Sequence, residues 1–182
     1  MAKRCILILG GARSGKSRYA QELAEQSGDG VMFVATAEPL DDEMKSRIEN
    51  HKRVRPATWQ TLEAPENVGV RLNESLSNQG TVIIDCITLL ASNILGRCKN
   101  SIDAENAVVQ EVNALIDSMK KSNATFIIVS NEIGLGIVPE NDLARQYRDV
   151  LGRVNQILAK FATDVYFMIA GIPVQIKCTA TL

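Results

Sequence analysis

The sequence predicts an α/β fold with a mostly parallel sheet, helices on both faces and an antiparallel strand at the C-terminal edge. Three observations lead to this fold class. Short apolar runs alternate with longer amphipathic segments, each apolar run is apolar throughout, and the last two runs are close enough to form a hairpin. Continuously apolar strands are buried on both faces, and their alternation with helices is typical of parallel sheets.

Length and composition are those of one ordinary globular domain, which we expect to span residues 1–182. The chain has 46% hydrophobic and 23% charged residues and a formal net charge of −1. This near-neutral charge argues against a nucleic-acid or membrane-surface binder, which needs an extended basic face. No apolar run reaches the roughly 20 residues that span a bilayer. The four cysteines form no Cys-x-x-Cys pair, so they indicate neither a zinc site nor a disulfide framework, and we expect a cytoplasmic protein.

Five short runs rich in β-branched and other apolar residues predict strands, and the segments between them predict helices. The segment 42–52 also carries signals at its ends. Asp41, Asp42 and Glu43 place negative charge at its N-terminus, and Pro56 lies just beyond its C-terminus. The predicted strands are 5–9, 31–35, 81–85, 125–130 and 165–169. The predicted helices are 16–26, 42–52, 67–76, 88–95 and 103–121.

The clearest helix begins near Asn141, whose side chain can cap a helix N-terminus. Apolar residues then recur at three- and four-residue steps, which predicts one apolar stripe on an amphipathic helix. The stripe consists of Leu143, Tyr147, Val150, Leu151, Val154, Ile157, Leu158 and Phe161. Beyond it, Gly171-Ile172-Pro173 separates the apolar runs 167–170 and 174–176, and this spacing predicts a hairpin whose last strand is antiparallel.

A phosphate-binding motif follows the first predicted strand. Gly10-Gly11-Ala12-Arg13-Ser14-Gly15-Lys16-Ser17 matches G-x-x-x-x-G-K-[ST] in full, with an apolar strand before it and an amphipathic helix after it. The glycines let the backbone wrap around phosphate oxygens, with amide hydrogens at the helix N-terminus pointing inward. We expect Lys16 to reach the β- and γ-phosphates and the Ser17 hydroxyl to bind Mg²⁺. A chance glycine turn is the alternative, and the flanking strand and helix argue against it.

Two carboxylates at strand ends are candidates for the same site. Asp85 ends the strand 81–85, at the carboxyl edge where α/β sheets bind ligands, and we expect it to hold Mg²⁺ together with Ser17. A solvated strand-end aspartate is the alternative. Glu132 follows the strand 125–130 at the same edge, either as an active-site carboxylate or as a group that only orders its loop. The chain lacks an Asn-Lys-x-Asp segment of the kind that reads guanine, which argues against a switch GTPase.

The only histidine, His51, lies in a basic cluster with Lys52, Arg53 and Arg55. In a protein that binds a polyphosphate, this cluster is suited to a second contact with the nucleotide. A neutral imidazole is a competent nucleophile toward phosphorus, and the neighbouring cations would stabilise charge on the leaving phosphate. A direct kinase does not need such a histidine, whereas a nucleotidyltransferase with a covalent intermediate does. The alternative is a solvated helix end in which the imidazole serves as a cap.

A set of short segments spread over nearly the whole chain points to one family. The segments are the run from Gly10 to Arg18, Ala35-Thr36-Ala37, Leu40-Asp41-Asp42-Glu43-Met44, Arg47-Ile48, His51-Lys52, Arg55-Pro56, Trp59, Asp85-Cys86-Ile87-Thr88, the run from Asn131 to Pro139, and the run from Arg148 to Gln156. Together they resemble the bifunctional adenosylcobinamide kinase/adenosylcobinamide-phosphate guanylyltransferase. Several of them are peculiar to that family, which makes the resemblance specific.

The resemblance implies a two-step enzyme of coenzyme B12 assembly and salvage, with a RecA-like P-loop fold and a homotrimeric assembly. GTP or ATP first phosphorylates the hydroxyl of the aminopropanol arm of adenosylcobinamide. GTP then guanylylates a histidine, which falls on His51, and adenosylcobinamide phosphate takes the GMP to give adenosylcobinamide-GDP. His51 and Lys16 are the catalytic residues implied. The implied nucleotide contacts are the P-loop, Ala35, Thr36, Ala37, Lys52, Arg53, Val54, Arg55, Glu63 and Asp85.

Two other classes of function fit the residues alone. One is a small-molecule kinase with a single activity, in which His51 only binds phosphate, and the other is a regulatory nucleotide-binding module. Trp59 has two interpretations as well. It is one of eight aromatic residues, and we expect it to pack under the His51 segment. A platform that stacks guanine or the corrinoid is the alternative.

Overall fold

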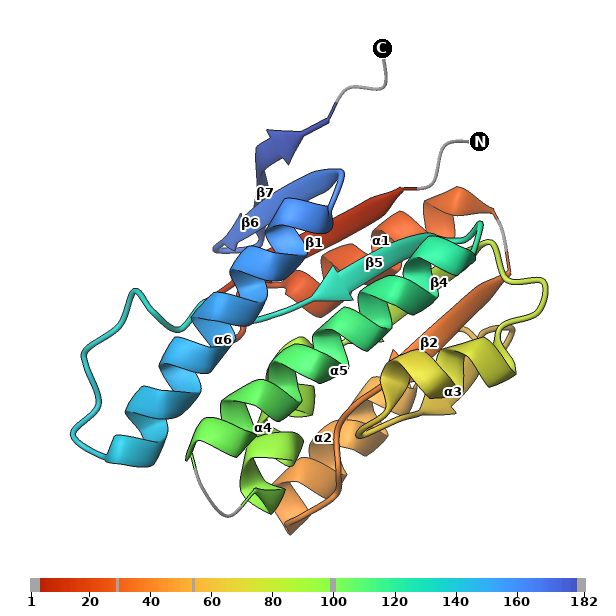
Figure 1. The fold of residues 1–182 in the computed structure, drawn as a ribbon. Coiled ribbons are helices and arrows are strands. Elements are labelled where there is room, and N and C mark those ends of the chain that lie inside the picture. Colours follow the sequence, from red (N-terminus) through yellow and green to blue (C-terminus); the bar gives the residue numbers. More distant parts are fainter. Residues whose placement is uncertain (1–3, 29, 54, 99–100, 180–182) are drawn as a thin grey trace.

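The computed structural model of the chain describes residues 4–28, 30–53, 55–98 and 101–179, which form a layered α/β structure (Figure 1). Its middle layer is a seven-stranded sheet with the order β3-β2-β4-β5-β1-β6-β7. All neighbouring strands are parallel except β6 and β7, which form an antiparallel hairpin at one edge. This arrangement confirms the predicted fold class. The strands are β1 Cys5–Gly10, β2 Val31–Ala35, β3 Gln60–Glu63, β4 Thr81–Asp85, β5 Thr125–Val129, β6 Asp164–Ile169 and β7 Ile172–Cys178.

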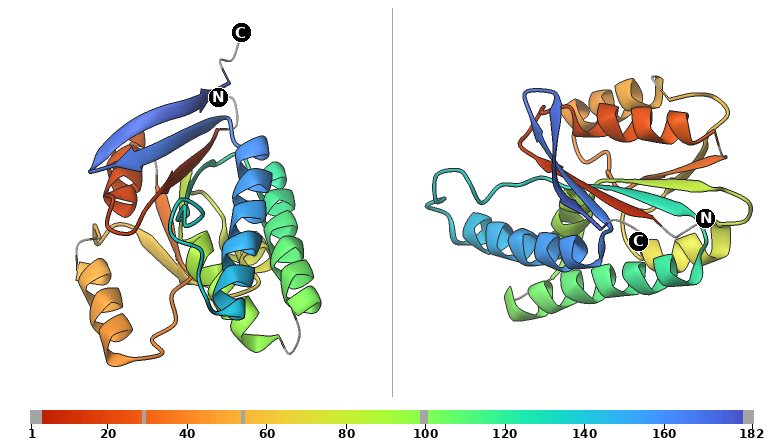
Figure 2. Two further views of the ribbon diagram at one scale, coloured as in Figure 1. Left: turned by 90° about the vertical axis from the view of Figure 1, so that its left-hand side faces the viewer. Right: turned by 90° about the horizontal axis from the view of Figure 1, so that it is seen from above.

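Helices cover both faces of the sheet. They are α1 Lys16–Ser27, α2 Asp42–Arg53, α3 Val68–Ser75, α4 Ile87–Arg97, α5 Ser101–Lys121 and α6 Asp142–Phe161. Figure 2 shows α1 and α2 on one face and the other four helices on the opposite face. The core is therefore divided by the sheet. In β1, for example, Leu7 and Leu9 join the larger cluster with α3, α4, α5 and α6, whereas Ile6 and Ile8 pack in the cluster with α1.

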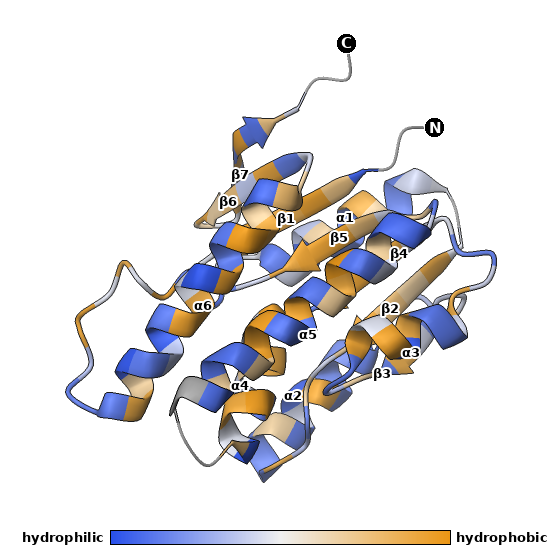
Figure 3. Cartoon of the chain, in the orientation of Figure 1, coloured by the Kyte–Doolittle hydropathy of each residue, from blue (hydrophilic) through white to orange (hydrophobic). Residues whose placement is uncertain are grey.

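Hydropathy follows this layering. In Figure 3 the central strands are predominantly hydrophobic, whereas the helices carry mixed hydrophobic and hydrophilic positions. Burial of apolar helix residues against the sheet stabilises the fold by roughly 25 cal/mol per Å² of apolar surface, but α2 has no buried residue and contributes little to it. Within the part of the chain that the structure describes, no helix combines the length and the apolar character needed to cross a membrane.

The predicted strands and helices are confirmed, and each of their ends lies within two residues of the prediction. The Asn141 cap is confirmed too, because its side-chain oxygen accepts a hydrogen bond from the Ala144 backbone N–H at 3.2 Å. Leu143, the first residue of the predicted apolar stripe, is exposed in the structure. This residue lies in the first turn of α6, which extends past the sheet in Figure 1, and its side chain is 62% exposed.

Two further features differ from the sequence-based prediction. Strand β3 was missed because Gln60–Glu63 is a mostly exposed edge strand without an apolar run. The hairpin turn is Ala170-Gly171, with φ values of 51° and 84°, and not Gly171-Ile172-Pro173. Positive φ at both positions matches the two-residue turns that fit the twist of paired strands. Pro173 lies inside β7, where an edge strand tolerates a residue without an N–H.

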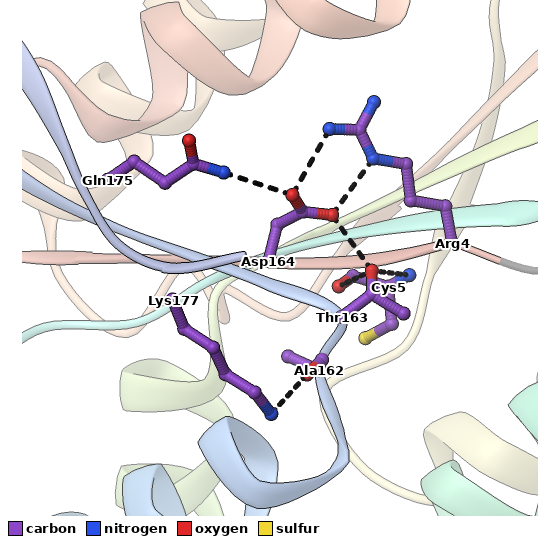
Figure 4. A network of polar contacts seen from close by, with 7 residues as sticks. All are labelled: Arg4, Cys5, Ala162, Thr163, Asp164, Gln175 and Lys177. Carbon is purple, nitrogen blue, oxygen red and sulfur yellow. Dashed lines mark hydrogen bonds and ion pairs between the residues drawn. The ribbon is translucent and has the colours of Figure 1, made fainter. Parts of the chain in front are cut away.

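An ion-pair network ties the N-terminus to the C-terminal hairpin (Figure 4). Arg4 Nε donates to Asp164 Oδ2 at 2.9 Å, and the Thr163 hydroxyl donates to the same carboxylate at 2.9 Å. The hydrogen bond from Arg4 holds the pKa of Asp164 below its usual value, although burial acts in the opposite direction. A separate hydrogen bond, from Lys177 of β7 to the carbonyl of Ala162, attaches the hairpin to the C-cap of α6.

The Asp164 network predicts a pH-dependent contribution to stability. A lowered native-state pKa stabilises the fold above the unfolded-state pKa of about 4, and this contribution is lost as pH falls through the native value. Asp164→Asn should therefore lower the free energy of unfolding by about 1–3 kcal/mol at pH 7 and by progressively less in acid. Denaturant titrations from pH 7 to pH 3 measure the difference. Asp149→Asn, at a carboxylate that is 76% exposed, is the control; equal losses for Asp164→Asn at both ends of this range would refute the prediction.

Candidate active site

The carboxyl ends of four strands place the predicted site residues along one edge of the sheet. Ala35, the last residue of β2, pairs with Glu63 of β3 on one side and with Asp85 of β4 on the other. Strand β1 ends at the same edge, where Gly10 leads into the P-loop. Ala35 and Asp85, which are 50 positions apart in the sequence, are therefore neighbours because their strands are parallel and in register, and β5 separates Asp85 from the end of β1.

The P-loop has a backbone that requires glycine and is braced by the C-terminal hairpin. Gly10 has a φ of 147°, and a Cβ there would lie 2.7 Å from the carbonyl oxygen of Met168. The Gly171 N–H donates to the carbonyl of Ser14 at 3.1 Å, so the turn between β6 and β7 supports the loop from outside. Gly15 has a φ of 95° and leads into α1. The residues exposed at the loop are Gly11, Ala12 and Arg13.

Lys16 lies at the start of α1 with its side chain directed back over the loop. Its Nζ donates to the carbonyl of Gly11 at 2.6 Å, and only 7% of the residue is exposed. Burial lowers the pKa of Lys16, while the nearby Cys86 and Asp85 act in the opposite direction. Ser17 follows as the second residue of α1. The predicted phosphate-binding and metal-binding groups, Lys16, Ser17 and Asp85, are thus near one another at the positive end of a helix dipole.

A pocket lies between this edge of the sheet and α2. His51 is half-buried in its wall and shares the pocket with Asp85. Lys52 forms an ion pair with Glu63, which links α2 to β3 at the pocket rim. The structure therefore brings together in one pocket six of the residues that the sequence assigned to the nucleotide, whereas the P-loop residues do not line it; the six are Ala35, Ala37, Lys52, Arg55, Glu63 and Asp85. The pocket is lined by Phe33, Ala35, Ala37, Pro39, Met44, Arg47, Ile48, His51, Lys52, Arg55, Glu63, Asp85, Cys86 and Leu89.

Arg55 presents an unsatisfied guanidinium to this pocket. Its guanidinium carbon lies 3.7 Å from the centroid of the Phe33 ring, a cation–π contact, and its Nε and Nη1 are buried without a hydrogen-bond partner. Burial lowers the pKa of Arg55, with the negative charge of Asp85 opposing it. Buried donors of this kind are costly unless they are paired, so Arg55 is suited to an anionic ligand. Arg53 is exposed at the end of α2 and does not line the pocket, and Val54 lies outside the described residues.

Thr36 and Asn93 hold the strand ends in place. Thr36 is fully buried, and its hydroxyl donates to the Cys86 carbonyl at 2.7 Å and accepts from the Cys86 N–H at 2.8 Å. Asn93 of α4 donates to the carbonyls of Thr36 at 2.8 Å and Pro65 at 3.0 Å. Thr36 was predicted as a nucleotide contact, but its hydroxyl is used by this backbone network. Asn93 was missed because its partners are 57 and 28 residues away.

We expect Asn93→Ala to loosen the pocket without removing a group that lines it. The substitution leaves two backbone carbonyls without their donor, which should lower the free energy of unfolding by about 1–3 kcal/mol. Because the ends of β2 and β3 would no longer be fixed, KM for the nucleotide expected at this site should rise more than kcat falls. Steady-state kinetics and denaturant unfolding measure both effects. Asn73→Ala, which removes a hydrogen bond to Ser118 instead, is the matched control; equal kinetic effects in both variants would contradict this role of Asn93.

Cys86 is a second side chain in the pocket with a potentially nucleophilic atom. Burial is the main reason that its pKa is raised to about 11, and the adjacent Asp85 adds to the effect. The thiolate is the nucleophilic form of cysteine, and at neutral pH this thiol stays protonated. Cys86 is therefore a poor nucleophile at neutral pH, although it lines the same pocket as His51.

The sequence left two interpretations open for each of Glu132 and Trp59. The Glu132 carboxylate accepts a hydrogen bond from the Gly134 N–H at 2.7 Å, which confirms that it orders its loop. Trp59 is partly buried against the core cluster on the α1 face and lines a neighbouring pocket with Lys52 and Arg55. Its predicted contact under the His51 segment stays a prediction.

Comparison with known proteins agrees with this arrangement. The sequence model of the family described as "Cobinamide kinase / cobinamide phosphate guanyltransferase" matches residues 6–176. The chain belongs to this family. Its two activities, a cobinamide kinase and a cobinamide phosphate guanyltransferase, are therefore those of this enzyme.

Curated members of the cobinamide kinase/guanyltransferase family are similar to the chain over nearly its whole length. The bifunctional adenosylcobalamin biosynthesis protein CobU of Salmonella typhimurium is 41% identical, and its counterpart in Escherichia coli is 39% identical. Each alignment covers 94% of this chain and 99% of the relative. The bifunctional protein CobP of Pseudomonas aeruginosa is 41% identical, with 94% and 96% covered.

Solved structures of distant sequence share the fold of this family member. The RadB recombinase has a TM-score of 0.50 at 16% identity, covering 90% of this chain and 73% of its own. A protein from Pyrococcus horikoshii OT3 has a TM-score of 0.58 at 9% identity, covering 98% and 88%. Both likenesses agree with the α/β fold described above.

Proposed function

We propose that the guanyltransferase reaction of this enzyme proceeds through a covalent guanylyl group on His51. The kinase first phosphorylates the hydroxyl of the aminopropanol arm of adenosylcobinamide. GTP then donates GMP to His51, and adenosylcobinamide phosphate takes it to give adenosylcobinamide-GDP. The observation that carries this proposal is that His51 shares one pocket with Asp85 and Arg55, next to the P-loop lysine.

The proposed chemistry balances at each step. An imidazole nitrogen of His51 attacks the α-phosphorus of GTP, the N–P bond forms, and the bond from this phosphorus to pyrophosphate breaks. A phosphate oxygen of adenosylcobinamide phosphate then attacks the same phosphorus, and the imidazole leaves. Arg55 and Lys52 lie in the pocket with His51, where they would stabilise the negative charge on the transferred and departing phosphates. Splitting the transfer into two displacements is the usual benefit of a covalent intermediate.

Mg²⁺ is part of the proposal, and the residues present fit it. The Ser17 hydroxyl and the Asp85 carboxylate offer two oxygen ligands near Lys16. Mg²⁺ prefers oxygen ligands and is usually held by one or two carboxylates together with nucleotide phosphates and water. When bound, it would neutralise phosphate charge.

A cytoplasmic location and a homotrimeric assembly also belong to the proposal. The location rests on the unpaired pattern of the four cysteines, and the assembly rests on the resemblance to the family that the sequence motifs carry. Sedimentation of the purified enzyme at several concentrations tests the assembly, and a species of one chain throughout would contradict the trimer.

Incubation with GTP labelled in the α-phosphate tests the covalent intermediate. We expect label to stay on the denatured protein, to survive base and to be lost in mild acid, as a phosphoramidate does. Adding adenosylcobinamide phosphate should remove the label and release adenosylcobinamide-GDP. A protein that forms this product at full rate without ever retaining label would refute the intermediate while leaving the family's two activities intact.

A further inference from the structure

Glu132 occupies a distinctive position at the carboxyl edge of the sheet. Strand β5 lies between β1, which leads into the P-loop, and β4, which ends in Asp85. Val129, the last residue of β5, pairs with Ile8 on one side and with Asp85 on the other. The chain that leaves β5 therefore emerges between the two motifs expected to hold the triphosphate, and Glu132 is its third residue.

The segment that carries Glu132 is fixed by contacts on several sides. The Glu132 N–H donates to the carbonyl of Gly10, the first P-loop residue, at 3.0 Å. The preceding residue, Asn131, is held through its N–H by the Thr88 hydroxyl at 2.8 Å and through its carbonyl by Asn155 at 2.9 Å. A carboxylate on so firmly attached a backbone can be positioned against a bound substrate.

The side chain of Glu132 can accept more hydrogen bonds than the one that its loop donates. Oε1 accepts from the Gly134 N–H at 2.7 Å, the residue is half-buried, and within the described residues it forms no ion pair. A carboxylate has about four lone-pair sites, so Glu132 can accept further hydrogen bonds or a proton. Its negative charge also lies beside a phosphate-binding loop, where it repels the nucleotide. A residue needed only to accept one N–H could be uncharged. A negatively charged carboxylate at this position is explained if it accepts a proton during the reaction.

We propose that Glu132 is the general base of the kinase reaction. The hydroxyl oxygen of the cobinamide attacks the γ-phosphorus, the new O–P bond forms, the bond from this phosphorus to the nucleoside diphosphate breaks, and the hydroxyl proton passes to the Glu132 carboxylate. His51 lies on α2, which forms one wall of the pocket opposite the ends of β2, β3 and β4, whereas Glu132 follows β5 beside β1. The two reactions would thus use different groups along one bound triphosphate. The inference needs only the kinase activity of the family and does not depend on a guanylylated histidine.

Glu132→Gln separates the catalytic role from the loop-ordering role. The amide oxygen of glutamine still accepts the Gly134 N–H, but the side chain no longer accepts a proton. We expect kcat of the kinase reaction to fall about 10²–10⁴-fold, the range that general-base catalysis supplies. Guanylyl transfer to separately supplied adenosylcobinamide phosphate should stay within about threefold of the parent. Glu140→Gln, an exposed carboxylate in the same loop, should leave both rates unchanged.

A second variant keeps the test decisive if the loop is disturbed. Glu132→Ala removes both the base and the acceptor for Gly134, and added formate should restore part of the kinase activity because a small carboxylate can occupy the gap. Kinase activity of Glu132→Gln within fivefold of the parent would overturn the proposal. A parallel loss of both activities in Glu132→Gln would overturn it as well, because that result indicates a role in nucleotide binding or folding.

Discussion

In the His51→Asn protein, guanylyl transfer should fall by at least about 10³-fold, whereas kinase activity should stay within about threefold of the parent. Asparagine keeps a polar group of similar reach but cannot form the N–P bond, so covalent catalysis is lost outright. The kinase reaction needs only a positioned hydroxyl, the γ-phosphate and the groups around the P-loop. Both rates are measured on one purified preparation, with adenosylcobinamide for the kinase and adenosylcobinamide phosphate for the transferase.

Substitutions of the neighbouring cations are the control for the His51→Asn experiment. Lys52 and Arg55 line the same pocket, so Lys52→Ala and Arg55→Ala should weaken GTP binding and slow pyrophosphate departure. Both variants should still retain some labelled GMP on the protein, because their nucleophile is intact. If His51→Asn kept more than a few per cent of guanylyl transfer, or lost the kinase reaction in parallel, His51 would have another role.

Lys16→Ala and Asp85→Ala should impair both reactions, in contrast to His51→Asn. Lys16 is buried at the P-loop with Asp85 nearby, and both reactions begin from the same bound nucleotide. Loss of a preorganised charged group of this kind costs about 10²–10³-fold in kcat. Lys45→Ala, at an exposed lysine of α2 that forms an ion pair with Asp42, is the matched control. A Lys16→Ala enzyme with near-parent rates in either assay would refute a shared nucleotide site.

The parts of the site that lie within one short segment could be predicted from the sequence. The P-loop is continuous from Gly10 to Ser17, so its glycines, lysine and hydroxyl identify it without any knowledge of the fold. Asp85 could be placed because it ends an apolar run, and parallel strands bring such ends to one edge. The positions of His51, Lys52 and Arg55 in one pocket agree with the basic cluster that the sequence displays.

The parts that depend on contacts between distant segments could not be predicted. Asn93 is an ordinary helix residue in the sequence, and only the fold shows that it holds Thr36 and Pro65. The contact of Arg55 with Phe33 likewise joins the end of the α2 region to a buried strand. Strand β3 was missed because an exposed edge strand needs neither an apolar run nor alternation. Its backbone hydrogen bonds with β2 hold it in the sheet, and these cannot be read from its own residues.

Peptide mapping of the GMP adduct tests the central claim of a guanylylated His51 most directly. The enzyme is incubated with GTP and Mg²⁺ in the absence of corrinoid, digested under basic conditions that preserve a phosphoramidate, and sequenced by tandem mass spectrometry. We predict GMP on the peptide that contains His51 and on the imidazole itself, with release when adenosylcobinamide phosphate is added before digestion. GMP on another residue, or full transferase activity with no adduct on His51, would contradict the account.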